Sequence, residues 1–163
     1  MLINLARRVA VLALVAVAVA PVAHAQTATQ TVTFAVNAIN QIAFTGTPSL
    51  TITTAVAGSA PTSVTDATAS WAVTTNQTGA KITASIPTIM PTGLTLSVNL
   101  GNPTGATSAG YLALGTTGVD LVTAITKLGQ GSLAVTYKLD ATAAAGVVTS
   151  ATRVVTYTIS GGA

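Results

Sequence analysis

The sequence has no cysteine and no glutamate, and its only histidine is His24, close to the N-terminus. Acid–base, nucleophilic and metal-assisted catalysis depend mainly on these missing side chains. The composition therefore argues against an enzyme, and we expect neither a cofactor nor a bound metal. Beyond residue 25 the charged residues are Asp66, Lys81, Asp120, Lys127, Lys138, Asp140 and Arg153.

Residues 1–25 have the pattern of a secretory signal peptide. Arg7 and Arg8 give a positively charged start, and residues 9–20 form an apolar run shorter than a membrane-spanning helix requires. Ala23-His24-Ala25 is a cleavage site of the A-x-A type. We therefore predict a secreted protein, extracellular or at the cell surface, with no membrane attachment after cleavage. The alternative is an N-terminal membrane anchor.

Cleavage changes the charge of the protein. The formal charge of the whole chain is +3, but two of its six basic residues lie in the leader. Four bases against three acids leave the mature chain at +1, so the high isoelectric point does not indicate nucleic-acid binding. A secreted domain without cysteine must be held together by packing alone.

The mature sequence alternates apolar and polar residues in short runs separated by Gly, Pro, Asn and Ser, which is typical of β-strands. Thr and Val favour a strand over a helical turn even in the ambiguous run 119–127, and residues 141–146 are interpreted as a loop. We expect an all-β, immunoglobulin-like antiparallel β-sandwich with Greek-key connections, formed by residues 41–163. The predicted strands cover residues 29–36, 42–44, 49–55, 69–75, 82–86, 94–100, 111–114, 119–127, 133–139 and 153–159.

Residues 69–75 and 82–86 are predicted to form a hairpin, because residues 76–79 have the composition of a tight turn. Trp71 lies on the apolar face of the first of these strands, which favours a core residue over a platform for sugar binding. Asn76-Gln77-Thr78 matches a glycosylation sequon but is interpreted here as part of the turn.

The sequence does not favour a calcium site or an intramolecular isopeptide bond. Calcium requires several clustered oxygen ligands, whereas the three aspartates are isolated in the sequence and suit solvated turns. An intramolecular isopeptide bond requires a buried lysine, whereas the lysines suit solvated edge positions. The residues concerned are Asp66, Asp120 and Asp140 for calcium, and Lys81, Lys127 and Lys138 for the isopeptide bond.

The first segment after the leader has the pattern of a strand followed by a break. Val32, Phe34 and Val36 alternate with small or hydroxylated residues, and residues 37–41 interrupt the alternation. The segment is either the first strand of its own sandwich or a donor strand that completes the sheet of another subunit. The scarcity of charge favours exchange, because secreted β-proteins usually protect their sheet edges with charge and proline.

The C-terminal part resembles a known family of secreted bacterial proteins. Residues 133–139, the Ala144-Ala145-Gly146 turn and residues 153–159 are similar to the closing hairpin of pilin-like sandwich subunits, including spore-coat-U-like proteins. The resemblance implies a filament polymerised by strand exchange. The chain differs from chaperone–usher pilins in lacking their disulfide, which leaves open whether a chaperone assists assembly.

These patterns together predict a structural subunit of an extracellular bacterial filament or matrix fibre, with itself as partner and no nucleic acid. The N-terminal donor strand and its hinge occupy residues 26–40, with Val32, Phe34 and Val36 as the side chains that fill the groove. The alternative is a monomeric surface-binding module, an adhesin or a carbohydrate binder, with its site on loops 87–93 and 101–110. The predicted acceptor groove comprises Leu133, Val135, Tyr137, Val155, Tyr157 and Ile159.

Overall fold

The computed structural model describes residues 24–162. Residues 1–23 of the predicted signal peptide lie outside this range. The chain divides into two units, residues 1–35 and 36–163. Residues 24–39 are extended and belong to no strand, and the strands described below all lie in the second unit.

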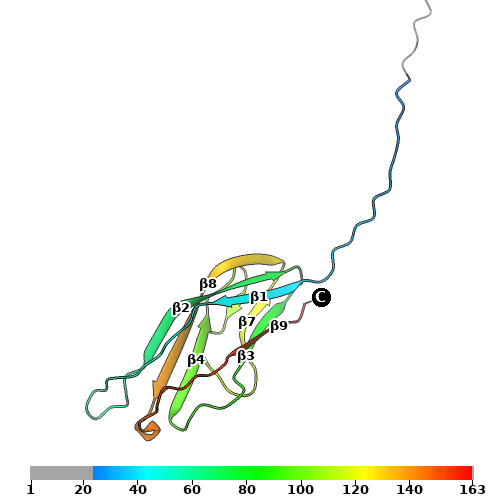
Figure 1. Ribbon diagram of the computed structural model, residues 1–163. Helices are drawn as coiled ribbons and strands as arrows, with labels where there is room; N and C mark the ends of the chain where they lie inside the picture. The colour runs from blue at the N-terminus through cyan, green and yellow to red at the C-terminus, as the bar shows by residue number, and fades with distance from the viewer. Residues whose placement is uncertain (1–23, 163) are drawn as a thin grey trace, which may run out of the picture. The chain divides into compact units, whose positions relative to one another are not determined.

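The second unit is all-β and consists of two antiparallel sheets, as Figure 1 shows. One sheet has the strand order β1-β2-β8-β4-β6, and the other has the order β5-β7-β3-β9. Its only helical element in the described range is a short 3-10 turn, η1 (Ala143–Ala145). The strands are β1 (Asn40–Thr45), β2 (Val64–Thr75), β3 (Ala80–Ser85), β4 (Leu94–Leu100), β5 (Thr107–Ser108), β6 (Leu112–Ala113), β7 (Val119–Ile125), β8 (Leu128–Ala141) and β9 (Thr156–Ser160).

Alternate side chains of the two sheets meet in one core, so the predicted all-β sandwich is confirmed. Trp71 and Val73 on β2 are each 1% exposed, and Ile82 on β3 and Val98 on β4 are fully covered. The interpretation of Trp71 as a core residue is therefore confirmed. Burial of such side chains stabilises a sandwich by about 1.5–3 kcal/mol each, before the cost of ordering the chain.

The predicted hairpin between residues 69–75 and 82–86 is wrong. Strand β2 pairs with β1 and β8, whereas β3 pairs with β7 and β9 in the other sheet. Residues 76–79 therefore cross from one sheet to the other. The side chain of Asn76 accepts a hydrogen bond from the Ile39 main chain and donates one to the Asn37 carbonyl, which ties this crossing to the start of β1.

The C-terminal strands do not form the hairpin implied by the family resemblance. Strand β8 lies in the five-stranded sheet and β9 in the four-stranded sheet. The two strands face each other across the core, where the hydroxyls of Tyr137 and Tyr157 are 2.7 Å apart and hydrogen-bonded. The ring of Phe44 stacks on Tyr157 with centroids 3.8 Å apart. The residues between the strands lead from one sheet to the other.

Two predicted strands are not strands in this structure. Residues 29–36 have no pairing partner among the described residues, and residues 49–55 have only an isolated bridge between Ala55 and Pro61. The alternation is real in the second case, because Leu50 and Ile52 are half-buried while their neighbours are exposed. Alternation indicates which face a side chain takes, but pairing also needs a neighbouring strand.

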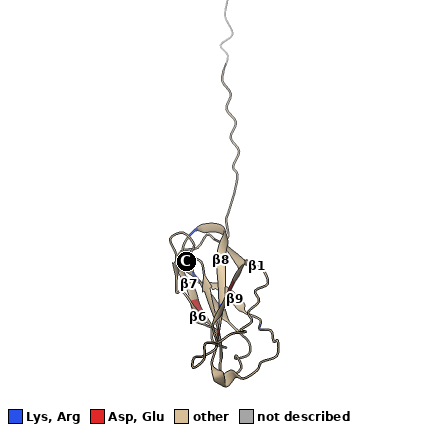
Figure 2. Ribbon diagram, turned by 90° about the vertical axis from the view of Figure 1, so that its left-hand side faces the viewer, with Lys and Arg blue, Asp and Glu red and all other residues tan. Residues whose placement is uncertain are grey.

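Charged residues are few on the described surface, as Figure 2 shows. Among residues 24–162 there are two ion pairs, Lys81–Asp120 at 3.0 Å and Lys138–Asp140 at 2.9 Å, and both are well exposed to solvent. Exposed pairs of this kind contribute about 0–1 kcal/mol each. Stability therefore depends on the core. No helix in the described range is long and apolar enough to cross a membrane.

Candidate functional site

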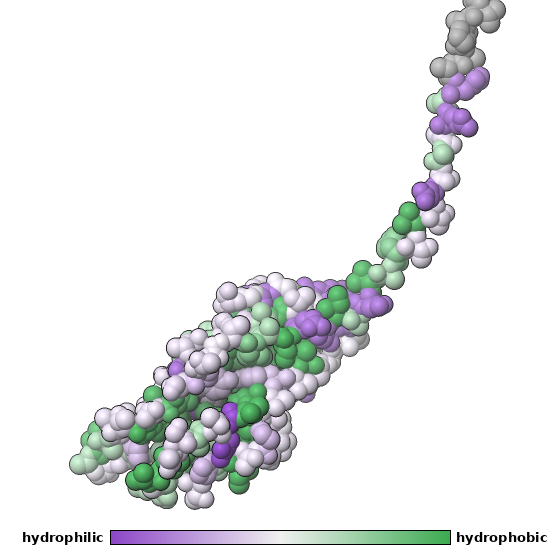
Figure 3. All heavy atoms as spheres, in the orientation of Figure 1, coloured by the Kyte–Doolittle hydropathy of each residue, from purple (hydrophilic) through white to green (hydrophobic). Residues whose placement is uncertain are grey.

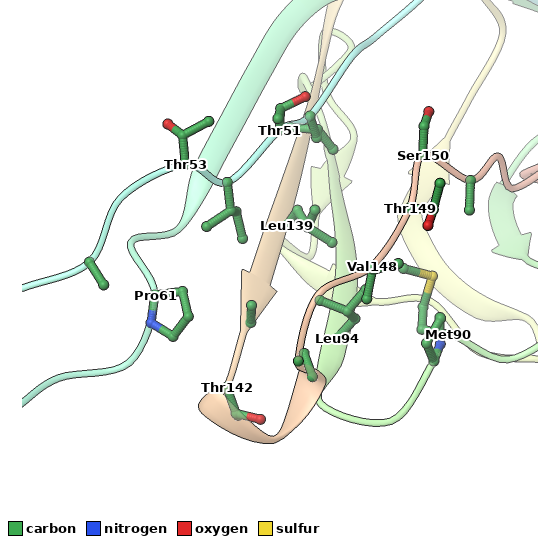
Figure 4. Close-up of a pocket in the computed structure, with 18 of the residues that line it drawn as sticks. Thr51, Thr53, Pro61, Met90, Leu94, Leu139, Thr142, Val148, Thr149 and Ser150 are labelled. Atoms are coloured by element: carbon green, nitrogen blue, oxygen red, sulfur yellow. The ribbon is translucent and has the colours of Figure 1, made fainter.

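One end of the sandwich has an open cleft of about 560 Å³, which we call the end cleft (Figure 4). Its floor is formed by Leu94 at the start of β4 and Leu139 on the neighbouring strand β8, and its walls are residues 50–55 and 148–153. One water molecule occupies about 30 Å³ in liquid water. The end cleft is many times larger than this volume and can therefore hold several side chains. Its volume lies within the range of about 300–1,000 Å³ typical of binding sites.

The first wall has the side-chain pattern of a strand although it pairs with no strand. Leu50 and Ile52 line the end cleft and are half-buried, whereas the intervening Thr51 and Thr53 are largely exposed. In Figure 4 the hydroxyl group of Thr53 points away from the end cleft. The wall therefore presents an aliphatic face to the end cleft and a hydroxylated face to solvent.

Asp66 holds the base of this wall. Its carboxylate accepts hydrogen bonds from the Ser49 main chain at 2.9 Å and from the Thr68 main chain and hydroxyl group. These hydrogen bonds, the one from Ser49 first, lower the pKa of the Asp66 carboxyl. The aspartate is thus occupied in fixing the chain just before Leu50.

The second wall follows η1, which packs closely on the loop before β4. Gly93 has a φ of +80°, and a Cβ atom at this position would lie 2.5 Å from the main-chain nitrogen of Ala145. The Thr142 main chain donates a hydrogen bond to the Gly93 carbonyl at 2.8 Å. Glycine at position 93 therefore permits the close approach that brings the second wall to the rim of the end cleft.

Within residues 24–162, Arg153 is the only charged residue that lines the end cleft. Its guanidinium group donates hydrogen bonds to the carbonyl groups of Thr152 and Ile89. Both contacts are with neutral main-chain groups, so the arginine fixes the second wall without attracting an acidic partner from the described residues. The end cleft is otherwise apolar or hydroxylated.

Large apolar side chains are exposed around the rim of the end cleft. Ile89 and Val154 are more than half exposed, and Val147 is fully exposed. Figure 3 shows apolar side chains reaching the surface at this end of the sandwich between paler, more polar strips. Clusters of exposed apolar residues beside a hollow are typical of an interaction surface.

The three predicted donor side chains lie in the extended N-terminal segment. Val32 is 73% exposed, Phe34 is 89% exposed and Val36 is 79% exposed. None of them belongs to a strand. Their alternation therefore has no use within the described part of this chain.

The predicted acceptor residues lie in the subunit's own core rather than along an open groove. The three from β8, Leu133, Val135 and Tyr137, are at most 9% exposed. The other three, Val155, Tyr157 and Ile159, are half-buried and pack against the same core. The row of alternate apolar side chains on β8 reaches the end cleft at its next position, Leu139.

The remaining candidates do not converge on a site. Among the described residues there is no group of three or more potential metal-binding side chains. Asp120 pairs with Lys81, and Asp140 accepts hydrogen bonds from Ser63 and Lys138 that lower its pKa, with Ser63 as the larger cause. The side chains of Lys81 and Lys138 are well exposed to solvent, whereas an intramolecular isopeptide bond requires a buried lysine.

Sequence reasoning missed the end cleft because its lining comes from several segments that lie far apart in the chain. The only signal in the sequence was the alternation of Leu50 and Ile52, which predicted the face of the wall but not its missing neighbour. No protein-family model, curated protein sequence or solved structure matches this chain.

Proposed function

We propose that the protein is the structural subunit of an extracellular bacterial filament or matrix fibre that polymerises by strand exchange. In this proposal residues 27–37 form the donor strand, and Val32, Phe34 and Val36 are buried in the next subunit. One observation carries the proposal: these three alternating apolar side chains are 73–89% exposed, and their segment pairs with no strand among residues 24–162.

Covering this segment requires both apolar burial and main-chain pairing. Burying a valine or phenylalanine side chain contributes about 1.5–3 kcal/mol, against an ordering cost of about 1–2 kcal/mol for every residue of the segment. Three apolar side chains do not offset that cost alone, so the main-chain hydrogen bonds of strand addition must supply the remainder. The segment is therefore expected to be ordered only where a sheet edge and an apolar groove are offered together.

We also propose that the sandwich is immunoglobulin-like with Greek-key connections. Support comes from the connections β2–β3 and β8–β9, each of which passes from one sheet to the other. Connections between sheets are what such sandwiches require.

Export and surface chemistry support assembly outside the cell. The leader pattern at residues 1–25 directs the chain to secretion in this proposal, and the mature chain is nearly neutral. A protein with so little net charge has weak protection against self-association. Fibres would therefore form by packing and main-chain pairing, with little dependence on salt.

The end cleft also favours a second candidate, the monomeric binding module. Met90 and Pro91 from loop 87–93 line it, as the loop prediction for that candidate requires, whereas loop 101–110 does not contribute. This candidate predicts a protein that stays monomeric at high concentration.

Electron microscopy of the mature protein tests the proposal, with a version that lacks residues 26–37 beside it. We expect uniform fibres from the mature protein and none from the truncated version. Monodisperse monomers from the mature protein would contradict polymerisation and favour the binding module.

A point substitution shows whether polymerisation needs the apolar face of the segment or only the presence of the segment. Phe34→Asp is expected to abolish fibres and leave a folded, soluble protein, because a charge cannot be buried in an apolar groove without a large cost. Thr33→Asp, on the opposite face of the same segment, is the matched control and should still polymerise. Unchanged fibres from Phe34→Asp would show that residue 34 is not buried in the assembly.

A further inference from the structure

Both walls of the end cleft have unused main-chain hydrogen-bonding groups. Among the described residues, no main-chain group of residues 50–53 or 147–154 takes part in a main-chain hydrogen bond, although the Thr152 carbonyl accepts one from the Arg153 side chain. Both walls are extended, and they run in opposite directions along the end cleft (Figure 1). Extended segments with free N–H and C=O groups are templates for an added strand.

The shape and chemistry of the end cleft restrict what such a strand can be. Its inward side chains would meet Leu50, Ile52, Leu94 and Leu139, so they must be apolar at alternate positions. The lining given by the described residues has one charged side chain, Arg153, which donates hydrogen bonds to two carbonyl groups while its buried Nε has no partner. An extended peptide with an apolar alternating face and free main-chain carbonyl groups suits this lining, and it needs no charged side chain of its own.

One segment of the chain has all of these properties. Residues 30–36 contain no charged residue and present Val32, Phe34 and Val36 at alternate positions. At about 3.3 Å per residue, seven extended residues span about 23 Å and the six-residue wall 148–153 about 20 Å, whereas the unused part of the first wall, residues 50–53, spans about 13 Å. The segment thus matches the second wall in length, and it matches residues 50–53 in apolar alternation and lack of charge.

We infer that the end cleft is the acceptor site and that residues 30–36 of a second copy of this chain fill it. The inference rests on the proposed function, because it identifies the surface that the exchanged strand occupies. It replaces the acceptor groove expected from the sequence, since Leu133, Val135 and Tyr137 already belong to the core. An inserted strand pairs antiparallel with one wall and parallel with the other.

Two adjacent valines give a matched test. Val148 lines the end cleft, whereas Val147 is fully exposed and is not part of the lining. Both side chains are accessible to solvent, so neither substitution by aspartate should unfold the protein. A synthetic peptide of residues 27–37 serves as the probe, and the full chain with Phe34→Asp serves as the acceptor, because its own segment cannot compete.

We expect the peptide to bind this acceptor, and the same peptide with Phe34→Asp to bind at least tenfold more weakly. Adding Val148→Asp to the acceptor should weaken binding by about 100-fold, because a charge would be buried beside the peptide. Adding Val147→Asp should leave binding unchanged. Fluorescence anisotropy of a labelled peptide measures all four combinations. Equal binding to the Val147→Asp and Val148→Asp acceptors, or no binding at all, would overturn the inference.

Fibre formation by Val148→Asp in the otherwise native chain separates this inference from the proposed function. Fibres that need residues 26–37 but persist in Val148→Asp would leave the function intact and place the acceptor site elsewhere. Closed dimers, instead of fibres, that dissociate with Val148→Asp would support the acceptor site and contradict the filament. Native monomers whose end cleft binds the peptide only when Phe34 is replaced would show that the chain fills its own end cleft, which overturns the second copy as occupant.

Discussion

The two ends of strand β4 show how one sandwich can be sealed in one half and open in the other. Leu100 is fully covered, and it packs in the same core as Trp71 from the same sheet and Ile82 from the opposite sheet. Leu94, six residues earlier on the same strand, is only half-buried and forms the floor of the end cleft. The strand and the residue type are the same, so the difference lies in what covers the side chain.

The covering differs because the four-stranded sheet is shorter than its partner. Strand β9 begins only at Thr156, and the preceding residues 148–153 are extended but unpaired. In the five-stranded sheet β8 runs as far as Ala141 and pairs there with Leu94. One sheet therefore extends past the other, and its apolar face at that end has no strand above it.

The largest effect is expected from the two leucines of β4. Leu100→Ala should lower the free energy of unfolding by about 3–4 kcal/mol, because it leaves a cavity in a fully packed region. Leu94→Ala should lower it by about 1 kcal/mol, since the side chain is half-exposed in the monomer. Urea unfolding of monomeric protein carrying Phe34→Asp measures both. Equal losses would mean that the two ends of the strand are packed alike.

A glycine substitution tests the wall of the open end. Gly93→Ala is expected to cost about 3 kcal/mol, because alanine is strained at positive φ and its Cβ would displace the main chain of Ala145. Gly105→Ala is the control: its φ is +75° but no atom lies within 4 Å of the added Cβ, so the cost should be about 1–2 kcal/mol. Thermal unfolding measures the difference.

Gly93→Ala should also weaken peptide binding to the end cleft, since Ala145 lies in its lining. Gly105→Ala should not. Binding that is equally strong in the two variants would show that the turn around η1 does not shape the end cleft.

The sequence predicted faces better than partners. Alternation alone predicts that Trp71 faces inward, and it is buried, as is Val73 two residues later, because alternation is set by the pleat of the strand itself. Pairing is not local: the turn-like composition of residues 76–79 suited a hairpin, yet these residues cross between the sheets. Strict alternation does not describe β7. Leu121 and Val122 are neighbours in the sequence and should face opposite ways, but both are buried, because the register between β7 and β3 shifts at this point.

The two parts of the candidate site differ in the same way. Val32, Phe34 and Val36 are contiguous in sequence, so their pattern was visible without a structure. The end cleft brings together residues such as Leu50, Met90 and Leu139, whose proximity depends on strand order. A pattern within one segment can be predicted from the sequence of that segment alone, but a surface built from several segments also requires the strand order.

The smallest effect is expected at the boundary between the two halves. Tyr137 lies between the buried Val135 and the half-exposed Leu139 on β8, and its hydroxyl group bonds to that of Tyr157. Tyr157→Phe removes this hydrogen bond but keeps the ring that stacks on Phe44. At pH 7 it should lower the free energy of unfolding by about 1 kcal/mol.

The pH dependence of that loss gives the sharper test. Burial is the main cause that raises the pKa of Tyr157, and the hydrogen bond to Tyr137 raises it further. The stabilisation that protonated Tyr157 contributes is therefore fully present below pH 10, the pKa of an unperturbed tyrosine, and is lost as the pH rises above that value. The difference in free energy of unfolding between wild type and Tyr157→Phe should therefore narrow between pH 9 and pH 11. Urea unfolding at these pH values measures it, with Tyr111→Phe, at an exposed position, expected to change stability by less than about 0.5 kcal/mol. A gap that stays constant to pH 11 would mean that Tyr157 is open to solvent, and that the sealed half ends before this residue rather than beyond it.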